Sequence, residues 1–571
     1  MDATAVTELV SDSVYGLWYI VGAVLVFFMQ AGFAMVETGF TRAKNAGNII
    51  MKNLMDFCIG TVAFLFLGYG IMCGENALGG FIGMPTMTML SLGNFDDVDW
   101  SNFFFQLVFC ATAATIVSGS MAERTKFSAY VVYSLFISLV IYPVEAHWVW
   151  GGGWLSEMGY FDWAGSTVIH MVGGTMAFIG AMFVGPRLGK YDKDGKPNAI
   201  AGHSITLGAL GCFILWFGWY GFNGAAGTTV QQVAQIFVTT TIGAAVAACT
   251  TMAITWVKDG KPDVSMTLNA SLAGLVGITA PCAVVDSLGA LVVGIVSGII
   301  TVVFVNVIDR AGVDDPVGAV TVHAVNGIWG GIAVGLLANP NIIDAYGVSC
   351  GAGLFYGGGF AQLGVQLLGI ICILAWTAVC AVILFGIIKA TIGLRVSADE
   401  EVEGLDISEH GLPSAYADFL PSIPPMGVAS GESVDLSGLK PALIEHPSKM
   451  SCVSIICNKD KFVQLKEALA QIGVTGMTVS NVMGCGIESG KTGQYRGVKT
   501  NVNLLPKLKV DIVVSEVDPA LVVAAANRVL HTGEAGDGKV FVAGVEDAYR
   551  ISTGQTGVAA LDMTTKVGSE K

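Results

Sequence analysis

The sequence predicts a polytopic, all-α membrane domain followed by a small ferredoxin-like βαββαβ domain. Hydrophobic residues make up 53% of its 571 residues and charged residues only 13%, against roughly 25% charged in soluble domains. Apolar runs long enough to cross a bilayer end near residue 390, where a soluble composition begins. The predicted parts are a membrane domain at 1–390, a C-terminal extension with a flexible linker at 391–448, the α+β domain at 449–560 and a tail at 561–571.

Apolar runs of about 20 residues each predict eleven transmembrane helices. The eighth run is the weakest, and the last is longer than a bilayer requires. No duplicated motif is evident among them, although inverted repeats are common in membrane transporters. The runs lie at 14–36, 54–74, 101–121, 128–145, 166–185, 203–222, 235–257, 266–282, 288–308, 317–338 and 354–388.

The basic residues predict the orientation of the membrane domain. All twelve Lys and Arg residues before position 389 lie in or beside loops that follow odd-numbered runs. The positive-inside rule then places the N-terminus outside and the C-terminus in the cytoplasm of a multi-pass protein of the cell inner (plasma) membrane. A missed helix would scatter these charges over both sides, so the pattern also supports the count. The residues are Arg42, Lys44, Lys52, Arg124, Lys126, Arg187, Lys190, Lys193, Lys196, Lys258, Lys261 and Arg310.

After residue 390 the pattern is that of a linker and then a soluble domain. The segment 391–416 is charged and rich in turn residues, and 417–447 is rich in Pro, Gly and Ser. Apolar alternation and helical spacing then predict the order βαββαβ, a ferredoxin-like unit. The strands are expected at 451–457, 478–484, 508–515 and 539–545, and the helices at 459–472 and 518–530.

Charge and cysteine pattern exclude several functions. The net charge of −15 argues against a nucleic-acid partner, because phosphate binding needs a basic face. The twelve cysteines form no CxxC pair, which excludes the common zinc and thioredoxin signatures. Oxidation of Cys73, Cys282 and Cys350, expected near the outer face, stays open. No spacing among the seven histidines indicates a metal site, and no nucleophile–base set indicates an enzyme.

Two histidines, His170 and His323, lie within otherwise apolar runs. An ionisable side chain inside a membrane helix is costly and is by default a functional hypothesis. The alternative is a structural hydrogen bond to a neighbouring helix. Two such histidines, each followed by small residues that permit close packing, favour function, because a neutral imidazole pair can share a proton.

Several segments of the membrane part carry a family resemblance. In chain order they include MAERTKFSAY, AHWVWGGGWL, FDWAGSTVIHMVGG, FGWYGFNGAAG, DDPVGAVTVHAVNGIWGG and GLRVSADEEVEGLDISEHG. They resemble signature segments of the Amt/Mep/Rh ammonium transporter family over residues 10–415. The resemblance implies a homotrimer in the lipid bilayer, each subunit with its own pore for ammonium or ammonia and no cofactor in that pore.

The resemblance assigns an outer site and a gate. Trp150 and Phe109 would hold ammonium by cation–π attraction, worth about 0.5–2 kcal/mol per contact. Phe109 and Phe222 would stack as the gate below that site. Asp162 would orient the recruitment site; its alternative is a helix cap, since DWAGS precedes an apolar run, and both roles can hold.

Below the gate, the resemblance implies a hydrophobic lumen lined by Trp219, His170 and His323. Carrying a bare cation through such a lumen costs many kcal/mol. Ammonium avoids this cost by losing its proton, crossing as ammonia and regaining a proton inside. Potassium has no proton to lose, and relay of the proton along the histidine pair would make transport electrogenic.

One departure from the family pattern concerns the outer site. Many members carry a serine after the gate phenylalanine whose hydroxyl accepts a hydrogen bond from ammonium, whereas this chain has Ala226 in the stretch Asn223–Ala226. The missing bond is worth roughly 1.5–3 kcal/mol if nothing replaces it. The alternative function is therefore an ammonium sensor with little flux. Conduction of another small neutral gas is a third and weaker alternative.

Residues 449–560 resemble a P-II signal protein, in segments such as HTGEAGDGKVFVAGVEDAYRISTGQTG. The resemblance implies a regulator that docks on the pore through a T-loop at about 486–504. Arg496 matches the arginine that plugs the pore mouth; its alternative is a solvated loop residue. The residues that match the family's adenine-nucleotide site are Gly486, Gly536, Gly538, Lys539 and Arg550.

The nucleotide site departs from the family at four positions. The modified T-loop tyrosine is Thr500, and the glutamine that helps bind magnesium and 2-oxoglutarate is Glu488. Ile487 and Ser552 replace two arginines that meet the outer phosphates, and each loss removes a charge-assisted contact. We therefore expect ADP or AMP to bind in preference to Mg-ATP.

Overall fold

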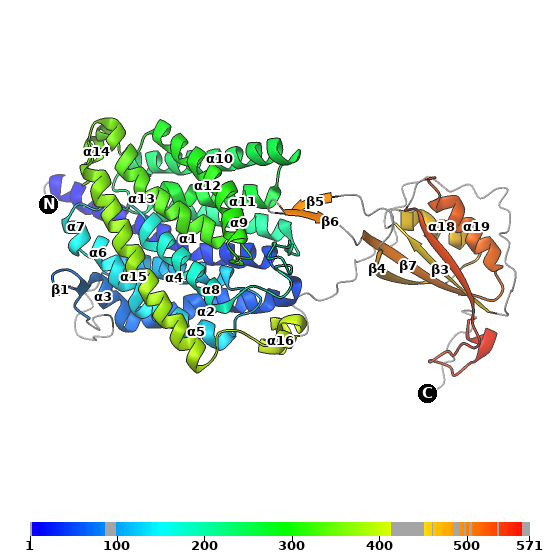
Figure 1. Cartoon of the computed structure of the whole chain (residues 1–571). Helices are drawn as coiled ribbons and strands as arrows, with labels where there is room; N and C mark the ends of the chain where they lie inside the picture. Colours follow the sequence, from blue (N-terminus) through cyan, green and yellow to red (C-terminus); the bar gives the residue numbers. More distant parts are fainter. Residues whose placement is uncertain are drawn as a thin grey trace. The chain divides into compact units, whose positions relative to one another are not determined.

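A computed structural model describes residues 3–85, 89, 99–412, 450–458, 461–474, 476–484, 492–495, 498–501, 505–533 and 536–561. The chain forms two compact units, one of residues up to 415 and the other mainly of residues from 416 onward. The first unit is helical, and the second contains a four-stranded sheet (Figure 1). The predicted linker at 417–447 lies outside the described residues.

In the described part of the chain, ten helices are long and apolar enough to cross a membrane. The eighth predicted span is α11 (Val264–Thr279), a shorter apolar helix of 16 residues. The other spans are α1 (Ala3–Phe40), α2–η2–α3 (Ala46–Ala63, Phe64–Gly68, Tyr69–Cys73), α4 (Trp100–Ser120), α5–η5–α6 (Phe127–Phe136, Ile137–Ile141, Tyr142–Val149), η6–α8 (Ser166–Met171, Val172–Val184), α9 (Ile205–Gly224), α10 (Val230–Asp259), α12 (Ser287–Arg310), η7–α13 (Val320–Val325, Asn326–Leu337) and α15 (Ala361–Thr391).

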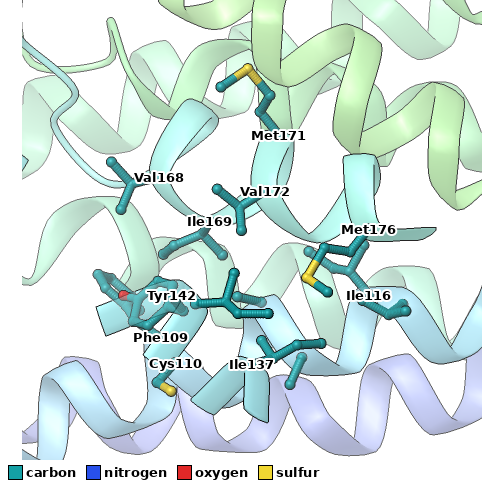
Figure 2. Packing of buried hydrophobic residues seen from close by; sticks show 14 of the residues in the cluster. Phe109, Cys110, Ile116, Ile137, Tyr142, Val168, Ile169, Met171, Val172 and Met176 are labelled. Atoms are coloured by element: carbon teal, nitrogen blue, oxygen red, sulfur yellow. The ribbon is translucent and has the colours of Figure 1, made fainter. Parts of the chain in front are cut away.

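The last predicted span begins too early. Residues 354–356 form a short 3₁₀ turn, and Gly357 with its positive φ of 85° ends it, so α15 starts only at Ala361. The membrane core itself is a continuous set of buried apolar side chains. In Figure 2, Ile169 and Val172 lie between η6–α8 and the helix α4, which carries Phe109 and Ile116. This packing fixes the segment that carries His170 against the segment that carries Phe109.

The second unit confirms the ferredoxin-like prediction. Its antiparallel sheet has the order β4-β7-β3-β8, with α18 and α19 packed against it. Strand β3 lies in the centre, where Val453 pairs with Ile512 on one side and with Val542 on the other. The elements are β3 (Ser451–Cys457), α18 (Phe462–Gln471), β4 (Thr478–Gly484), β5 (Thr492–Tyr495), β6 (Val498–Asn501), β7 (Leu505–Val514), α19 (Pro519–Leu530) and β8 (Gly538–Gly544).

Candidate functional site

A column of aromatic rings runs into the membrane unit from Trp150, the C-cap residue of α6. The Phe109 ring lies 5.9 Å from the Trp150 ring and 4.4 Å from the Phe222 ring, centroid to centroid. The Phe109 and Phe222 planes meet at 39°, so the two rings are tilted rather than parallel. Both side chains are almost fully buried, and together they close the column below Trp150.

The two histidines come together below these phenylalanines. Nδ1 of His170 and Nδ1 of His323 are 3.2 Å apart, a hydrogen-bond distance, although 153 residues separate them in sequence. His170 also stacks on Trp219, whose Nε1 donates to Thr279 Oγ1 at 2.8 Å, and on Phe222. A shared Nδ1–Nδ1 bond leaves Nε2 of each ring as its remaining site for gaining or losing a proton.

His170 lies in a π-helical turn, η6, and Asp162 caps the start of this turn. The Asp162 carboxylate accepts hydrogen bonds from the backbone N–H groups of residues 165–168, at 2.7 to 3.3 Å, and from the Thr167 hydroxyl. Gly165 precedes the turn with φ of 109°, a value that L side chains rarely adopt. The structure therefore shows the capping contacts of Asp162, and its effect on recruitment stays a prediction.

His323 lies in a second π-helical turn, η7, with the same arrangement. Asp315 accepts from the backbone N–H groups of Gly318 and Val320 at 2.9 and 2.8 Å, and Gly318 has φ of 84°. Both turns have the spacing Asp-x2-Gly-x4-His. The expectation of no duplicated motif was therefore wrong: the signal is the fixed spacing of three residue types, which the unlike residues between them concealed.

Different cavities lie beyond the two ends of this column. At the Trp150 end, an open cavity of about 520 Å³ is lined by Trp150, Asp162, Ala226 and Gln232, among others. At the other end, which we call the Glu37 end, His323 lines a small cavity of about 30 Å³ together with Phe33, Glu37 and Asn269. Sequence reasoning missed Glu37, because one acidic residue near the end of an apolar helix carries no distinctive pattern.

A buried network of ion pairs links the loops at the Glu37 end. Arg187 pairs with Asp314 at 2.9 Å and with Glu123 at 3.1 Å, and Glu123 also binds Arg42. Burial raises the pKa of Asp314, but the guanidinium groups of Arg187 and Arg124 outweigh it and hold this pKa well below its usual range. The carboxylate is therefore ionised, and the network ties four loops together.

The extension after α15 binds to this same end of the membrane unit. It forms two short helices, α16 (Ala398–Glu403) and α17 (Leu405–His410). Asp406 accepts from the backbone N–H groups of Gly47 and Asn48, and Asn48 Nδ2 lies 3.0 Å from His410 Nε2. Glu401 accepts from the N–H of Leu188 and pairs with Arg395. The extension thus contacts the start of α2 and the loop that carries Leu188.

The predicted nucleotide residues of the second unit are partly described. Gly536 and Gly538 precede and open β8, where Lys507 Nζ donates to the Gly536 carbonyl oxygen at 2.7 Å. A side chain at Gly538 would clash with the carbonyl of Ile456, so this position needs glycine. Lys539 follows in β8, and Arg550 binds the carbonyl oxygen of Ala560. Gly486, Glu488 and Arg496 lie outside the described residues.

Neither a metal site nor a disulfide appears in the described part of the chain. The described residues contain no cluster of three or more His, Cys, Asp or Glu side chains that could hold a metal ion. Cys73, Cys282 and Cys350 are free thiols. The thiol of Cys282 donates to the carbonyl oxygen of Thr279 at 3.3 Å, so it is bound locally rather than facing another cysteine.

Comparisons with known proteins match both units. The family model described as Ammonium Transporter Family matches residues 17–415, and the model described as Nitrogen regulatory protein P-II matches residues 450–555. The chain is 47% identical to the ammonium transporter Amt2 of Archaeoglobus fulgidus over 424 residues, which cover 71% of this chain and 88% of that protein.

Solved structures show the same likeness. A structure titled Sensor Amt Protein has a TM-score of 0.66 and 35% identity, and the match covers 71% of this chain and all of that one. The crystal structure of Mep2 from Candida albicans has a TM-score of 0.61 and 28% identity, and the match covers 68% of this chain and 87% of that one.

Proposed function

Since the chain belongs to the Ammonium Transporter Family and is a multi-pass membrane protein rather than an enzyme, we propose that it carries ammonium from the Trp150 end of its pore to the Glu37 end. The observation that carries this proposal is the contact between His170 and His323 directly below the Phe109–Phe222 pair. The Trp150 end would face outside and the extension the cytoplasm, because the basic residues gather in the loops on the extension's side.

The outer cavity suits recruitment of a small cation. The Trp150 ring lines the cavity beside Asp162, and its Nε1 donates to the Asp162 carbonyl oxygen at 2.9 Å, which fixes the ring. Ammonium would be held by the faces of Trp150 and Phe109. With Ala226 in place of a hydroxyl, ammonium would depend on other acceptors of this cavity, such as Gln232, Thr228 and backbone carbonyls, so we expect weaker capture of ammonium.

The step past the gate is governed by desolvation. The lumen around His170, Trp219 and Phe222 is buried and apolar, so a bare cation there costs many kcal/mol. Loss of a proton on the outer side turns ammonium into ammonia, which crosses as a neutral molecule. The proton would move along the bond between the two histidines, and the net movement would be one positive charge per ammonium.

The C-terminal P-II domain would regulate this pore. A tethered domain acts at an effective concentration of about a millimolar. Docking would therefore depend on the nucleotide state of the domain and not on its concentration. Arg496 would enter the inner mouth of the pore as a plug. The complete assembly would be a homotrimer in the lipid bilayer, with three pores and three P-II domains.

Current measurements on the purified protein in proteoliposomes test the proposal. The full chain is compared with a chain cut after Tyr416 and with His170→Ala. We expect a saturable ammonium-evoked current in the cut chain, its loss in His170→Ala and its reduction in the full chain. If the cut chain carries no current although ammonium binds, it is not a transporter.

In the P-II domain we propose an adenine-nucleotide site that prefers ADP or AMP. The support for the site is that Gly536 and Gly538 precede and open β8, next to Lys539. The support for the preference is that Ile487 and Ser552 stand where the family has arginines. Titration calorimetry of the full chain with ADP, AMP and Mg-ATP measures the preference. Tight binding of Mg-ATP that depends on 2-oxoglutarate would contradict it.

A sensor is the second candidate function. Ala226 weakens the outer site, and one similar solved structure is titled Sensor Amt Protein. In this function, occupancy of the pore would reach the P-II domain through the extension bound at Asp406 and His410, with little flux. Ammonium binding without current, together with an ammonium-dependent change in hydrogen exchange of residues 398–410, would select it.

A further inference from the structure

A buried carboxyl group lies at the inner end of the histidine pair. Glu37 is only 3% exposed, and it lines the 30 Å³ cavity together with His323. Phe33 lies one helical turn before Glu37 on the same face of α1, and its ring is 6.1 Å from the His323 ring. The fold therefore brings the Glu37 carboxyl to the next position along the column after His323.

The Glu37 carboxyl keeps unused capacity for hydrogen bonds. Ser118 Oγ, which has a single proton to donate, lies 2.8 Å from Oε1 and 2.6 Å from Oε2, and Asn53 Nδ2 donates to Oε2 at 3.3 Å. A carboxylate has about four acceptor sites, so two donors leave it able to bind a proton or a polar guest in the cavity. No ion pair among the described residues includes Glu37.

The size of the cavity suits proton transfer. A water molecule needs at least about 10–15 Å³ of such volume, so 30 Å³ holds about two waters or one ammonia molecule. His323 and Asn269 supply further polar groups in its lining. Because His323 uses Nδ1 for His170, its Nε2 is the nitrogen left to exchange a proton on this side.

We propose that Glu37 takes the proton from His323 at the inner end of the pore and returns it to ammonia, a step that rests on the proposed function. In the first transfer an N–H bond of His323 breaks and an O–H bond forms on Glu37, which leaves a neutral imidazole. In the second, that O–H bond breaks and an N–H bond forms on ammonia, so ammonium leaves and the carboxylate is restored. The proton therefore crosses the lumen on the two histidines and Glu37, and no ammonium ion has to enter it.

The charged groups around Glu37 are consistent with this role. Lys52 and Asp56, both on α2, act on it electrostatically, and His323 is the other titratable residue among the described residues that line the cavity. Asp56 is bound to the Ser134 hydroxyl and does not line the cavity. Asp56→Asn is therefore a matched control that removes a nearby buried charge outside the cavity.

The experiment compares the ammonium-evoked current with ammonia passage, measured by a pH dye inside the vesicles, in chains cut after Tyr416. Glu37→Gln is expected to lower the current roughly a hundredfold while ammonia still passes. Glu37→Asp is expected to recover part of the current, and Asp56→Asn to keep the wild-type ratio. A purely structural role would lower current and passage together.

Two results would overturn the inference while leaving the proposed function intact: an unchanged ratio in Glu37→Gln, or the same change in Asp56→Asn. A wild-type chain without any current would overturn both. Should Glu37→Gln fail to fold, infrared difference spectra of wild type and Glu37→Asp on adding ammonium decide. A carboxyl band that differs between them supports the proposal, and identical spectra contradict it.

Discussion

The turns that carry His170 and His323 share a backbone and differ in what lies beyond them. Each is a π-helical turn capped by an aspartate three residues before a glycine of positive φ. Beyond the His170 turn lies an open cavity of about 520 Å³ with aromatic rings, and beyond the His323 turn a cavity of about 30 Å³ with a carboxyl group. The same type of histidine-bearing turn therefore occurs twice in the chain, next to two chemically different cavities.

In the proposed function, this difference would give the pore a direction without a change of backbone. Aromatic faces attract a cation from water, whereas a buried carboxyl can hold a proton as a neutral group. The shared turns hold the two rings at hydrogen-bond distance, and the unlike surroundings would separate recruitment from release.

The largest effect is expected from removing either cap. Asp162→Ala and Asp315→Ala each leave backbone N–H groups buried without an acceptor, at about 1–3 kcal/mol per group. Both variants should lose the ammonium-evoked current and melt at clearly lower temperature. Scanning calorimetry of the purified protein and the proteoliposome current measure these losses.

Asp286→Ala is the control for these caps. Asp286 also accepts from a backbone N–H, that of Gly289 at 2.8 Å, and from the side chains of Asn339 and Tyr356, but it starts α12 away from the histidines. Its removal should cost about 1–3 kcal/mol and leave the current intact. If only one of the two pore caps proves essential, the two turns are not equivalent.

A hydroxyl introduced into the cavity at the Trp150 end should strengthen ammonium binding at that end of the pore. Ala226→Ser offers ammonium an acceptor, and we expect half-saturation at about tenfold lower ammonium. Ala225→Ser is the control, because Ala225 is the neighbouring residue but is buried and does not line the cavity. An unchanged half-saturation in Ala226→Ser would place the ammonium elsewhere in the cavity.

A smaller change is expected from Trp150→Phe. The phenyl ring keeps part of the cation–π attraction but loses the N–H that binds the Asp162 carbonyl, so half-saturation should rise about threefold. Trp163→Phe loses a similar bond, to the Asn223 carbonyl at 2.8 Å, in the same cavity and serves as control. Equal shifts in the two variants would argue against a special site at Trp150.

The smallest effect is expected from acid at the extension. Burial lowers the pKa of His410 below its ordinary value of 6.5, and the neutral ring accepts from Asn48. A depressed histidine pKa contributes stability above pH 6.5 and loses it as the pH falls below that value. The hydrogen-exchange protection of residues 398–410, measured relative to the intrinsic exchange rate at each pH, should therefore be lower at about pH 5.5 than at about pH 7.5.

His410→Asn should remove this pH dependence. Asp406 and Glu409 favour the charged ring and Lys52 opposes it, so the shift reflects burial more than charge. Hydrogen-exchange protection of residues 398–410 that stays constant with pH in the native chain would mean that His410 does not control the stability of the extension. The same control separates acid effects at the surface from proton transfer inside the pore.

Much of the fold follows from the sequence because its patterns are local. Long apolar runs and period-two strands predict the elements, and β3 begins and ends where its alternation does, at Ser451 and Cys457. The start of α15 was placed wrongly, because apolar residues continue through a turn that glycines impose. The hydrophobicity of a segment does not reveal where the backbone adopts a positive φ and the helix cannot continue.

The site was less open to prediction. His170 and His323 are conspicuous in apolar runs, yet only the fold shows their contact across 153 residues. Glu37 could not be chosen from sequence, since its role depends on a cavity that α1 forms with residues such as Leu215 and Val317. A site built between helices is set by packing, which one sequence does not reveal.

The π-helical form of η6 and η7 has a consequence for how this pore tolerates change. A π-helical turn holds one more residue than the α-helical turn it replaces, and each residue of an α-helix advances the side chains by about 100° around the axis. Deleting a single residue within Ser166–Met171 or Val320–Val325 would rotate the histidine away from its partner. Apart from the two histidines, these positions should accept many exchanges of residue type but no insertion or deletion, and a pore of this kind is expected to lengthen or shorten only in its loops.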